Sequence, residues 1–312
     1  MTKYAIVAHK FIPSCELDGL CALFLDKPEL PSSIGQNIIT CLATSPHDLA
    51  TGGAAGGDHT AIISAAGTLQ CFGENVHGQC DAVGNIDAVL AVAAGGDHTA
   101  AITEAGKLYC FGWNKHGQCS APDVGLVRAV TAGAHHTAVI TADGDLVCFG
   151  SNDYGQCEAP DMGKMFAVSA GCDHTAAITT AGELYCFGGN DDGQCTPPPL
   201  GRVTQVAAGH NHTAVITEAG ELICFGNNDQ GQCDAPDTGP VIAIATGCEH
   251  TAVIKPTGEL ICFGDNTEGQ CNVPDIGPVH TVAAGYGHTV AITRTGDVVC
   301  FGYNMDGRCN MS

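Results

Sequence analysis

A histidine–threonine pair recurs seven times at a nearly fixed interval in this chain of 312 residues. The first two pairs are 39 residues apart, and every later pair follows its predecessor by 38. A fixed period of this length indicates one supersecondary unit copied in tandem. We therefore expect residues 49–312 to form one closed domain, preceded by a non-repeat N-terminal extension, residues 1–48. The seven repeat histidines are His59, His98, His136, His174, His212, His250 and His288.

Glycines and short apolar runs divide each copy. In the second copy, Gly95, Gly106, Gly112 and Gly117 mark turns that need a positive φ or a close approach of two backbones. The runs between them are about six residues long or shorter, which predicts strands, because a helix would need ten or more. A further strand is expected after the Gln-Cys pair that ends the copy. The predicted fold is all-β: a seven-bladed β-propeller of four-stranded antiparallel blades.

The repeated motifs resemble those of a known family. Gly-x-x-His-Thr followed by Gly-x-Asn-x-x-Gly-Gln is similar to the regulator of chromosome condensation repeat, and the match covers residues 50–309. That family includes the Ran nucleotide-exchange factor, the plant ultraviolet-B receptor, repeats in giant ubiquitin ligases and a secreted β-lactamase inhibitor. This chain has Phe-Gly where the family usually has Trp-Gly, and Gly-Gln-Cys where it has Gly-Gln-Leu. The resemblance implies the propeller but leaves the function open, because one scaffold carries many activities.

Acidic residues dominate the composition. The chain has 33 Asp and Glu against 11 Lys and Arg, a formal net charge of −22. Direct nucleic-acid binding is therefore disfavoured, since it rests on clustered Lys and Arg, and a basic protein partner is favoured. No run of about 18 apolar residues occurs, so no membrane insertion is expected. The first residues do not read as a signal peptide, which favours an intracellular protein over a secreted one.

Seven equivalent histidines suggest either a metal ring or a structural role. We expect the structural role, in which each imidazole bonds the backbone of the turn in its own blade with help from the threonine. No Asp or Glu stands at a fixed offset to complete a site in every copy. Neither a metal nor a cofactor is expected. The other histidines, His77, His116, His135 and His210, are scattered and expected to face solvent.

Cysteine is unusually frequent, with 19 in the chain. Fourteen form seven pairs nine residues apart, each bracketing a Gly-x-Asn-x-x-Gly turn, with one member expected on the third strand and one on the fourth. A cross-strand disulfide in each blade would meet the distance requirement. Reduced cysteines acting as small buried apolar groups are the alternative, and the absence of a secretion signal favours them. Zinc is disfavoured because two thiolates fall short of four ligands. The pairs are Cys71 and Cys80, Cys110 and Cys119, Cys148 and Cys157, Cys186 and Cys195, Cys224 and Cys233, Cys262 and Cys271, and Cys300 and Cys309.

The loops of one face carry the candidate partner-binding residues. Chain direction places the Gly-x-x-His turns and the Asn-x-x-Gly loops on the same face of the ring. Aromatic side chains are enriched at interaction hot spots, so the aromatic residues of these loops indicate a docking surface. The candidate residues are Trp113, Lys115, His116, Tyr154, Tyr286, Tyr303 and Met305.

The sequence thus predicts a non-enzymatic protein–protein interaction propeller, a scaffold or accessory subunit that is monomeric within a larger complex. No nucleophile elbow, phosphate-binding loop or singular carboxylate pair supports an enzyme. One alternative is a guanine-nucleotide exchange factor for a Ran-like small GTPase, against which stand the absence of an insertion in any copy and of a basic tail. Another is a secreted, disulfide-stapled inhibitor or binder. Photoreception is disfavoured because Trp113 is the only tryptophan.

Overall fold

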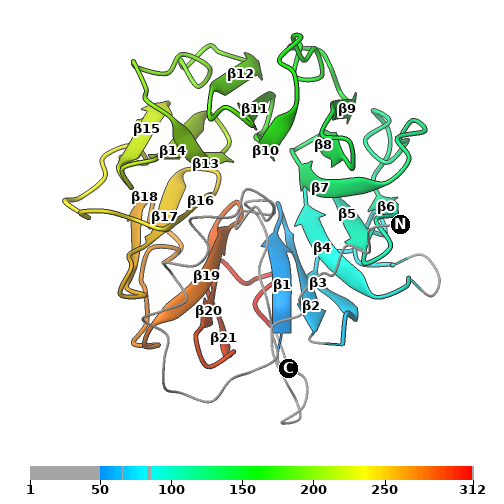
Figure 1. The fold of residues 1–312 in the computed structure, drawn as a ribbon. Coiled ribbons are helices and arrows are strands. Elements are labelled where there is room, and N and C mark those ends of the chain that lie inside the picture. The colour runs from blue at the N-terminus through cyan, green and yellow to red at the C-terminus, as the bar shows by residue number, and fades with distance from the viewer. Residues whose placement is uncertain (1–49, 65, 83–85, 311–312) are drawn as a thin grey trace, which may run out of the picture. The chain divides into compact units, whose positions relative to one another are not determined.

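Seven antiparallel sheets make up the part of the chain that the computed structural model describes, residues 50–64, 66–82 and 86–310. No helix occurs among these residues, and each sheet consists of three consecutive strands. Figure 1 shows the sheets following one another around a common centre, so that each sheet is one blade of a propeller.

Strands from blade 1 to blade 7 follow in groups of three. They are β1 (Ala50–Ala55), β2 (His59–Ser64) and β3 (Leu69–Gly73); β4 (Val89–Ala94), β5 (His98–Thr103) and β6 (Leu108–Gly112); β7 (Val127–Ala132), β8 (His136–Thr141) and β9 (Leu146–Gly150); β10 (Met165–Ala170), β11 (His174–Thr179) and β12 (Leu184–Gly188); β13 (Val203–Ala208), β14 (His212–Thr217) and β15 (Leu222–Gly226); β16 (Ala243–Thr246), β17 (His250–Ile254) and β18 (Leu260–Gly264); β19 (Val279–Ala284), β20 (His288–Thr293) and β21 (Val298–Gly302).

The apolar core lies between the blades. Ile102 of blade 2 is fully buried against Val127, Val130 and Val139 of blade 3, and the same kind of cluster joins the other neighbouring blades. All six residues of β5 are buried, because the middle strand is covered by a neighbouring blade on each face. Burying one Ile or Val side chain contributes about 1.5–3 kcal/mol. A single blade therefore depends on its neighbours for most of its buried apolar surface.

The predicted fourth strand is not confirmed, since the described blades have three strands each. In blade 2 the segment around Cys119 forms consecutive turns. Asn114 closes these turns with its side chain: its Oδ1 accepts the backbone N–H of Cys119 at 2.8 Å, and its Nδ2 donates to Ser120 Oγ at 3.0 Å. The backbone donor that a fourth strand would offer to a ladder is thereby bound to a side chain. We call this segment, residues 113–119 in blade 2 and the equivalent residues of each other blade, the Asn loop.

Two glycines of each copy have specific steric roles. Gly112 has φ of 104°, in the left-handed region that favours glycine. Gly95 lies where an added Cβ would come 2.4 Å from the Cε1 atom of His98 and 2.5 Å from the carbonyl oxygen of Gly133. The glycine three residues before each repeat histidine thus makes room for the imidazole and for the next blade.

The predicted extension, residues 1–48, lies outside the described residues, together with Cys15, Cys21 and Cys41. The boundary between it and the propeller stays a prediction.

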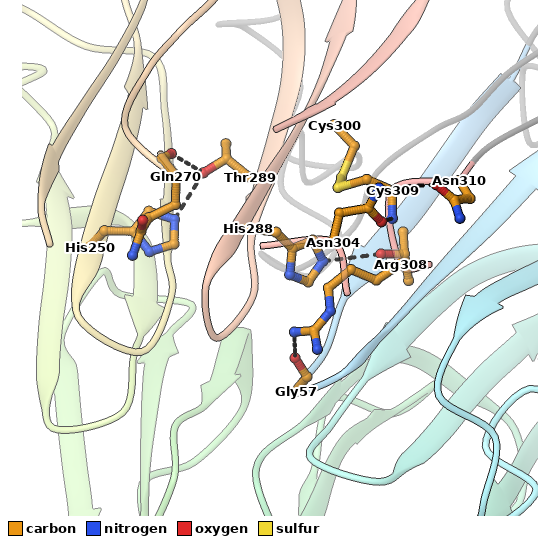
Figure 2. The surroundings of a disulfide bond; sticks show 11 residues. Gly57, His250, Gln270, His288, Thr289, Cys300, Asn304, Arg308, Cys309 and Asn310 are labelled. Atoms are coloured by element: carbon orange, nitrogen blue, oxygen red, sulfur yellow. Dashed lines mark hydrogen bonds between the residues drawn. A yellow bond between two sulfur atoms is a disulfide. The ribbon is translucent and has the colours of Figure 1, made fainter. Parts of the chain in front are cut away.

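Blade 7 packs directly on blade 1 and completes the ring. Val290 and Ile292 of β20 form one apolar cluster with Ala55 and Ile62 of blade 1. His288 Nε2 lies 3.0 Å from Thr60 Oγ1 across the same seam. Figure 2 shows His288 and Arg308 side by side there, facing Gly57 of blade 1. Every sheet uses consecutive strands, so none of the described strands is exchanged between these blades.

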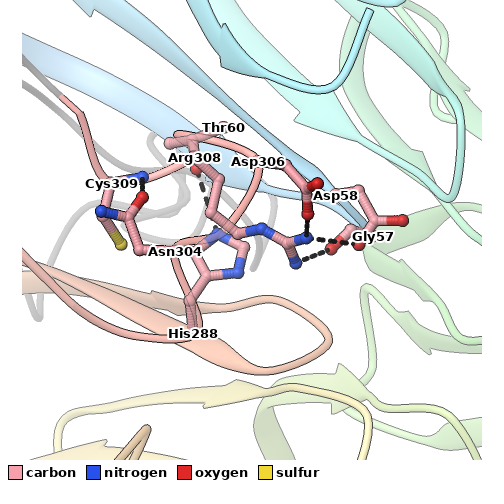
Figure 3. Close-up of polar contacts among 8 residues, drawn as sticks. All are labelled: Gly57, Asp58, Thr60, His288, Asn304, Asp306, Arg308 and Cys309. Atoms are coloured by element: carbon pink, nitrogen blue, oxygen red, sulfur yellow. Dashed lines mark hydrogen bonds and ion pairs between the residues drawn. The ribbon is translucent and has the colours of Figure 1, made fainter. Parts of the chain in front are cut away.

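Arg308 is specific to this seam, since the other six copies have glutamine at its position. Its side chain is 1% exposed, and Nη1 donates to the carbonyl of Gly57 at 2.9 Å. Its Nη2 pairs with Asp58 at 2.7 Å and also with Asp306 (Figure 3). The guanidinium also lies 4.6 Å from the ring centroid of Tyr303. Blade 7 thereby holds the first turn of blade 1 with a buried cation.

We expect Arg308→Met to lower the free energy of unfolding by about 1–3 kcal/mol, because the Gly57 carbonyl and two carboxylates lose their partner. Both carboxylates are about 40% exposed, so solvent compensates for part of the loss. Guanidinium unfolding measures the change. Arg202→Met is the matched control, because its pair with Glu218 is exposed on both sides. Equal effects of the two substitutions would contradict the role of Arg308.

Candidate functional site

Each repeat histidine is completely buried and bonds the neighbouring blade. His98 Nε2 lies 2.9 Å from Oγ1 of Thr137 in blade 3, and that hydroxyl donates to the carbonyl oxygen of Gln118 at 2.8 Å. Figure 2 shows the same arrangement for His250, Thr289 and Gln270. The expectation that each imidazole bonds its own blade was wrong: the partner is the threonine of the next blade. The linked pairs are His59 and Thr99, His98 and Thr137, His136 and Thr175, His174 and Thr213, His212 and Thr251, His250 and Thr289, and His288 and Thr60.

The hydrogen-bond pattern assigns the tautomer of these histidines. Since the single proton of the Thr137 hydroxyl goes to the Gln118 carbonyl, His98 must donate through Nε2–H. Nδ1 then carries no proton, and it is buried without a partner in all seven repeat histidines. Protonation would place a charge in an apolar seam. Burial accordingly lowers the pKa of His98, His136 and His212 to about 3, and that of His59, His174 and His250 to about 4.

The turns before the repeat histidines and the Asn loops lie on one face, which we call the loop face. In blade 2 the N–H of Trp113, at the start of the Asn loop, donates to the carbonyl of Asp97 in the turn at 2.8 Å. Equivalent bonds link loop and turn in the other blades. Each Asn loop also contacts the following blade, as the bond from Thr137 to Gln118 shows. Residues from neighbouring blades therefore meet on this face.

One group of candidate residues gathers around the single tryptophan. The Trp113 ring lies 5.7 Å from His77, 5.2 Å from His116 and 5.0 Å from His135, measured between ring centroids. His116 and His135 stack at 5.3 Å. These four residues come from blades 1, 2 and 3, and we call them the Trp113 cluster. Lys115 and Tyr154 are exposed on the same blades.

A second group lies on blade 7. Tyr286 and Met305 are 42% and 84% exposed, and Tyr303 is half-buried against Arg308. A hollow of about 380 Å³ lies between Tyr286 and Tyr303. Four carboxylates line it beside Arg308: Asp58, Asp265, Glu268 and Asp306.

Basic residues are scarcer on the loop face than in the rest of the described chain, although both parts are net acidic. Lys115 and the buried Arg308 are the only basic residues in the described turns and Asn loops. Twelve acids share these segments, which makes the loop face strongly negative. They are Asp58, Glu74, Asp97, Asp153, Asp173, Asp191, Asp192, Asp229, Glu249, Asp265, Glu268 and Asp306. The remaining bases of the described residues lie at the opposite edge, where several pair with nearby acids: Lys107, Arg128, Lys164, Arg202, Lys255 and Arg294.

Two cysteines outside the pairs lie at the centre of the loop face. Cys172 and Cys248 line the narrow axial opening together with His210 and Tyr286, while most of the lining is alanine and glycine. Burial, followed by the neighbouring thiols and carboxylates, raises the pKa of Tyr286. Within the described residues, no three His, Cys, Asp or Glu side chains are placed to hold a metal ion.

Sequence reasoning missed how these residues converge. His77 and His116 are exposed as expected, whereas His135 and His210 are half-buried, and three of the four join the Trp113 cluster. The role of Arg308 was missed too, although its departure from glutamine was visible in the sequence. The second cysteine of each pair lies in a turn rather than on a fourth strand.

Comparison with known proteins identifies the family. The model of the regulator of chromosome condensation (RCC1) repeat matches seven segments that together span more than half of the chain: residues 51–79, 89–118, 127–156, 167–194, 203–232, 241–270 and 279–308. The chain belongs to this repeat family. No curated protein sequence matches it, and no helix among the described residues is long and apolar enough to cross a membrane.

Solved structures of low sequence identity share the fold of this RCC1-repeat protein. Prp20p of Saccharomyces cerevisiae, described with its binding to Gsp1p and histones, has 17% identity and a TM-score of 0.64, covering 72% of this chain and 74% of its own. Human WBSCR16 has 21% identity and a TM-score of 0.61, covering 72% and 79%. The CRINKLY WD40 ectodomain of the Arabidopsis thaliana receptor kinase ACR4 has 18% identity and a TM-score of 0.68, covering 81% and 95%. At these identities the likeness shows the fold alone.

Acid should unfold the ring. A histidine whose pKa is about 6.5 in the unfolded chain and 3 to 4 in the folded chain binds its proton only on unfolding between those values. Its stabilisation is complete above pH 6.5 and decreases by about 1.4 kcal/mol per pH unit as the pH falls. The summed loss of stability from seven such groups exceeds a domain stability of about 5–15 kcal/mol within one to two pH units. We expect cooperative unfolding at about pH 5, measured by far-ultraviolet circular dichroism.

The slope of stability against pH provides the control. His174→Gln should lower stability at pH 7 and reduce the number of protons taken up on unfolding by one. A ring that stays folded at pH 4, or a slope that this substitution leaves unchanged, would contradict the assignment of the buried histidines as the source of acid lability.

Proposed function

We propose that this RCC1-repeat protein is a non-enzymatic interaction propeller that docks a protein partner with a basic surface on its loop face, as a scaffold or accessory subunit of a larger assembly. The observation that supports it is the scarcity of exposed bases in the turns and Asn loops, which carry twelve acids and two bases, one of them buried. The rest of the described chain is net acidic as well, but it carries more bases. The other six described bases lie at the opposite edge.

An acidic face of this kind selects partners by charge. Complementary potentials speed the encounter of two proteins and suppress partners of the wrong sign, and salt screens the effect. A basic partner would meet fewer positive side chains on the loop face than at the opposite edge, where Lys164, Arg202 and Lys255 lie. Such binding should weaken as the ionic strength rises.

The two aromatic groups supply anchor points on that face. The Trp113 cluster and Tyr154 lie on one side, and Tyr286, Tyr303 and Met305 lie on the other. Aromatic residues dominate the energetics of many interfaces. The hollow beside Arg308 combines carboxylates with two tyrosine rings, a composition that suits a lysine or arginine side chain through ion pairs and cation–π contacts.

The proposal involves no catalytic step and no cofactor. The seven repeat histidines are the obvious candidates for proton transfer. They are completely buried, however, and Nε2 of each is hydrogen-bonded to a threonine of the next blade. Exchange of nucleotide on a Ran-like GTPase has no specific support in the geometry of the described residues. The binding experiment below distinguishes it from the scaffold role.

Partner capture from native extract, followed by mass spectrometry, tests the loop face. Trp113→Ala combined with Tyr154→Ala should reduce recovery of the specific partner by about tenfold or more, as expected for the loss of hot-spot anchors. Asp191→Lys combined with Asp229→Lys should reduce it through charge reversal. Both pairs of changes lie in exposed loops and should leave the circular dichroism spectrum unchanged.

Matched changes at the opposite edge provide the control. Glu218→Lys combined with Glu221→Lys introduces the same charge change away from the loop face, and we expect capture to remain at the original level. If these changes abolish capture while the loop-face variants retain it, the proposed face is wrong. Accelerated nucleotide release from purified Ran GTPase would replace the scaffold proposal with the exchange-factor function.

A further inference from the structure

One cysteine pair is already joined by a covalent bond. Cys300 at β21 and Cys309 at the end of the blade 7 Asn loop form a disulfide, with their Cα atoms 5.2 Å apart (Figure 2). This separation lies within the usual range of about 4.4–6.8 Å. The described blades 1 to 6 carry cysteines at the same two positions with free thiols.

The backbone around these free pairs matches that of the oxidised pair. The N–H of Cys309 donates to Asn304 Oδ1 at 2.8 Å, and the N–H of Cys119 donates to Asn114 Oδ1 at the same distance. The next turn bond is equal too: Asn310 N to the Gly307 carbonyl and Ser120 N to the Gly117 carbonyl both measure 2.9 Å. The same anchor holds the second cysteine of every blade within 2.8–2.9 Å. Formation of a disulfide therefore requires no rearrangement of this loop.

Thiols of two further pairs are already in contact. Interaction with the Cys80 thiol raises the pKa of Cys71, and interaction with the Cys195 thiol raises that of Cys186. In the second blade the thiol of Cys119 donates weakly to the carbonyl of Trp113 at 3.4 Å. The second thiol gives up that weak contact when it bonds the first.

We propose that the six remaining pairs are disulfide sites of the same kind, so that the propeller takes one within-blade disulfide per blade from a low-molecular-weight disulfide such as oxidised glutathione. The sequence pattern agrees, because neither cysteine of a pair occurs without the other in any of the seven copies.

The two cysteines of a pair have different roles in the exchange. Cys110 packs in the core between blades 2 and 3, and burial raises its pKa far more than that of Cys119, which rises to about 11. The outer thiolate attacks the small disulfide, forms a mixed disulfide and releases one small thiolate. The inner cysteine then gives its proton to solvent and attacks the outer sulfur, releasing the second. Two protein thiols are oxidised and one small disulfide is reduced to two thiols.

These bonds would constrain the docking surface. Trp113, Lys115 and His116 lie between Cys110 and Cys119, and Tyr154 lies between Cys148 and Cys157. Tyr303 and Met305 lie inside the loop that the Cys300–Cys309 bond closes. A closed loop has fewer conformations to lose when a partner binds. Oxidation therefore orders the loops that carry six of the seven candidate partner-binding residues, whichever partner they bind.

Peptide mapping of the full chain tests the pairing. The protein is reduced, exchanged into oxidised glutathione, treated with an alkylating agent and digested without reduction. We expect seven crosslinked peptides, each joining cysteines nine residues apart, while Cys172 and Cys248 are recovered as alkylated thiols. Crosslinking limited to Cys300 and Cys309, or a mixture of pairings between blades, would overturn the proposal.

Rates and stability provide two further readouts. In blade 2, where burial raises the pKa of the outer thiol of Cys119 to about 11, the rate of crosslinking should rise about tenfold per pH unit between pH 7 and 9. Cys119→Ser should remove only the blade 2 crosslink, leaving the other six, and should lower the melting temperature of the oxidised protein but not that of the reduced protein. An oxidised protein that melts at the same temperature with and without this crosslink would show that the disulfide does not stabilise the blade.

Discussion

Hydrogen bonds between neighbouring blades allow polar side chains to be buried in an otherwise apolar ring. In six of the seven seams the imidazole donates to a threonine hydroxyl, which donates to a glutamine carbonyl of the imidazole's own blade, as for His98, Thr137 and Gln118. None of the three groups could be buried without the others, because an unpaired buried polar group costs about 1–3 kcal/mol. The glycine three residues earlier is required by the same arrangement, since a Cβ at Gly95 would collide with the His98 ring.

The seam between blades 7 and 1 differs from the other six in its chemistry. Arg308 replaces the glutamine and reaches Gly57 and Asp58 of the first blade. An acidic, tyrosine-lined hollow lies beside it on the loop face. One residue thus joins the ends of the repeat array and breaks the sevenfold symmetry of the surface. The Trp113 cluster breaks it again on blades 1 to 3.

Local loop chemistry connects the fold to the proposed function. An asparagine side chain closes every Asn loop, so the loops are ordered from within and their outer positions are free to vary. Acidic and aromatic residues occupy those positions on the face where a partner would dock. The cysteine pairs bracket the same loops, which links the redox state of the protein to the rigidity of its docking surface.

The sequence by itself determined the number of blades, the all-β class, the three strands observed in each blade and the glycine turns, because these follow from local periodicity and backbone sterics. Only the tertiary structure decided what the repeat histidines bond, since their partners lie in another copy and are reached only when the ring stacks one blade on the next. The described blades also lack the expected fourth strand, because the Cys119 N–H that a strand would donate to a ladder is bound to the side chain of Asn114. The convergence of His77, Trp113 and His135 has the same origin: they belong to three copies, and ring geometry alone makes them neighbours.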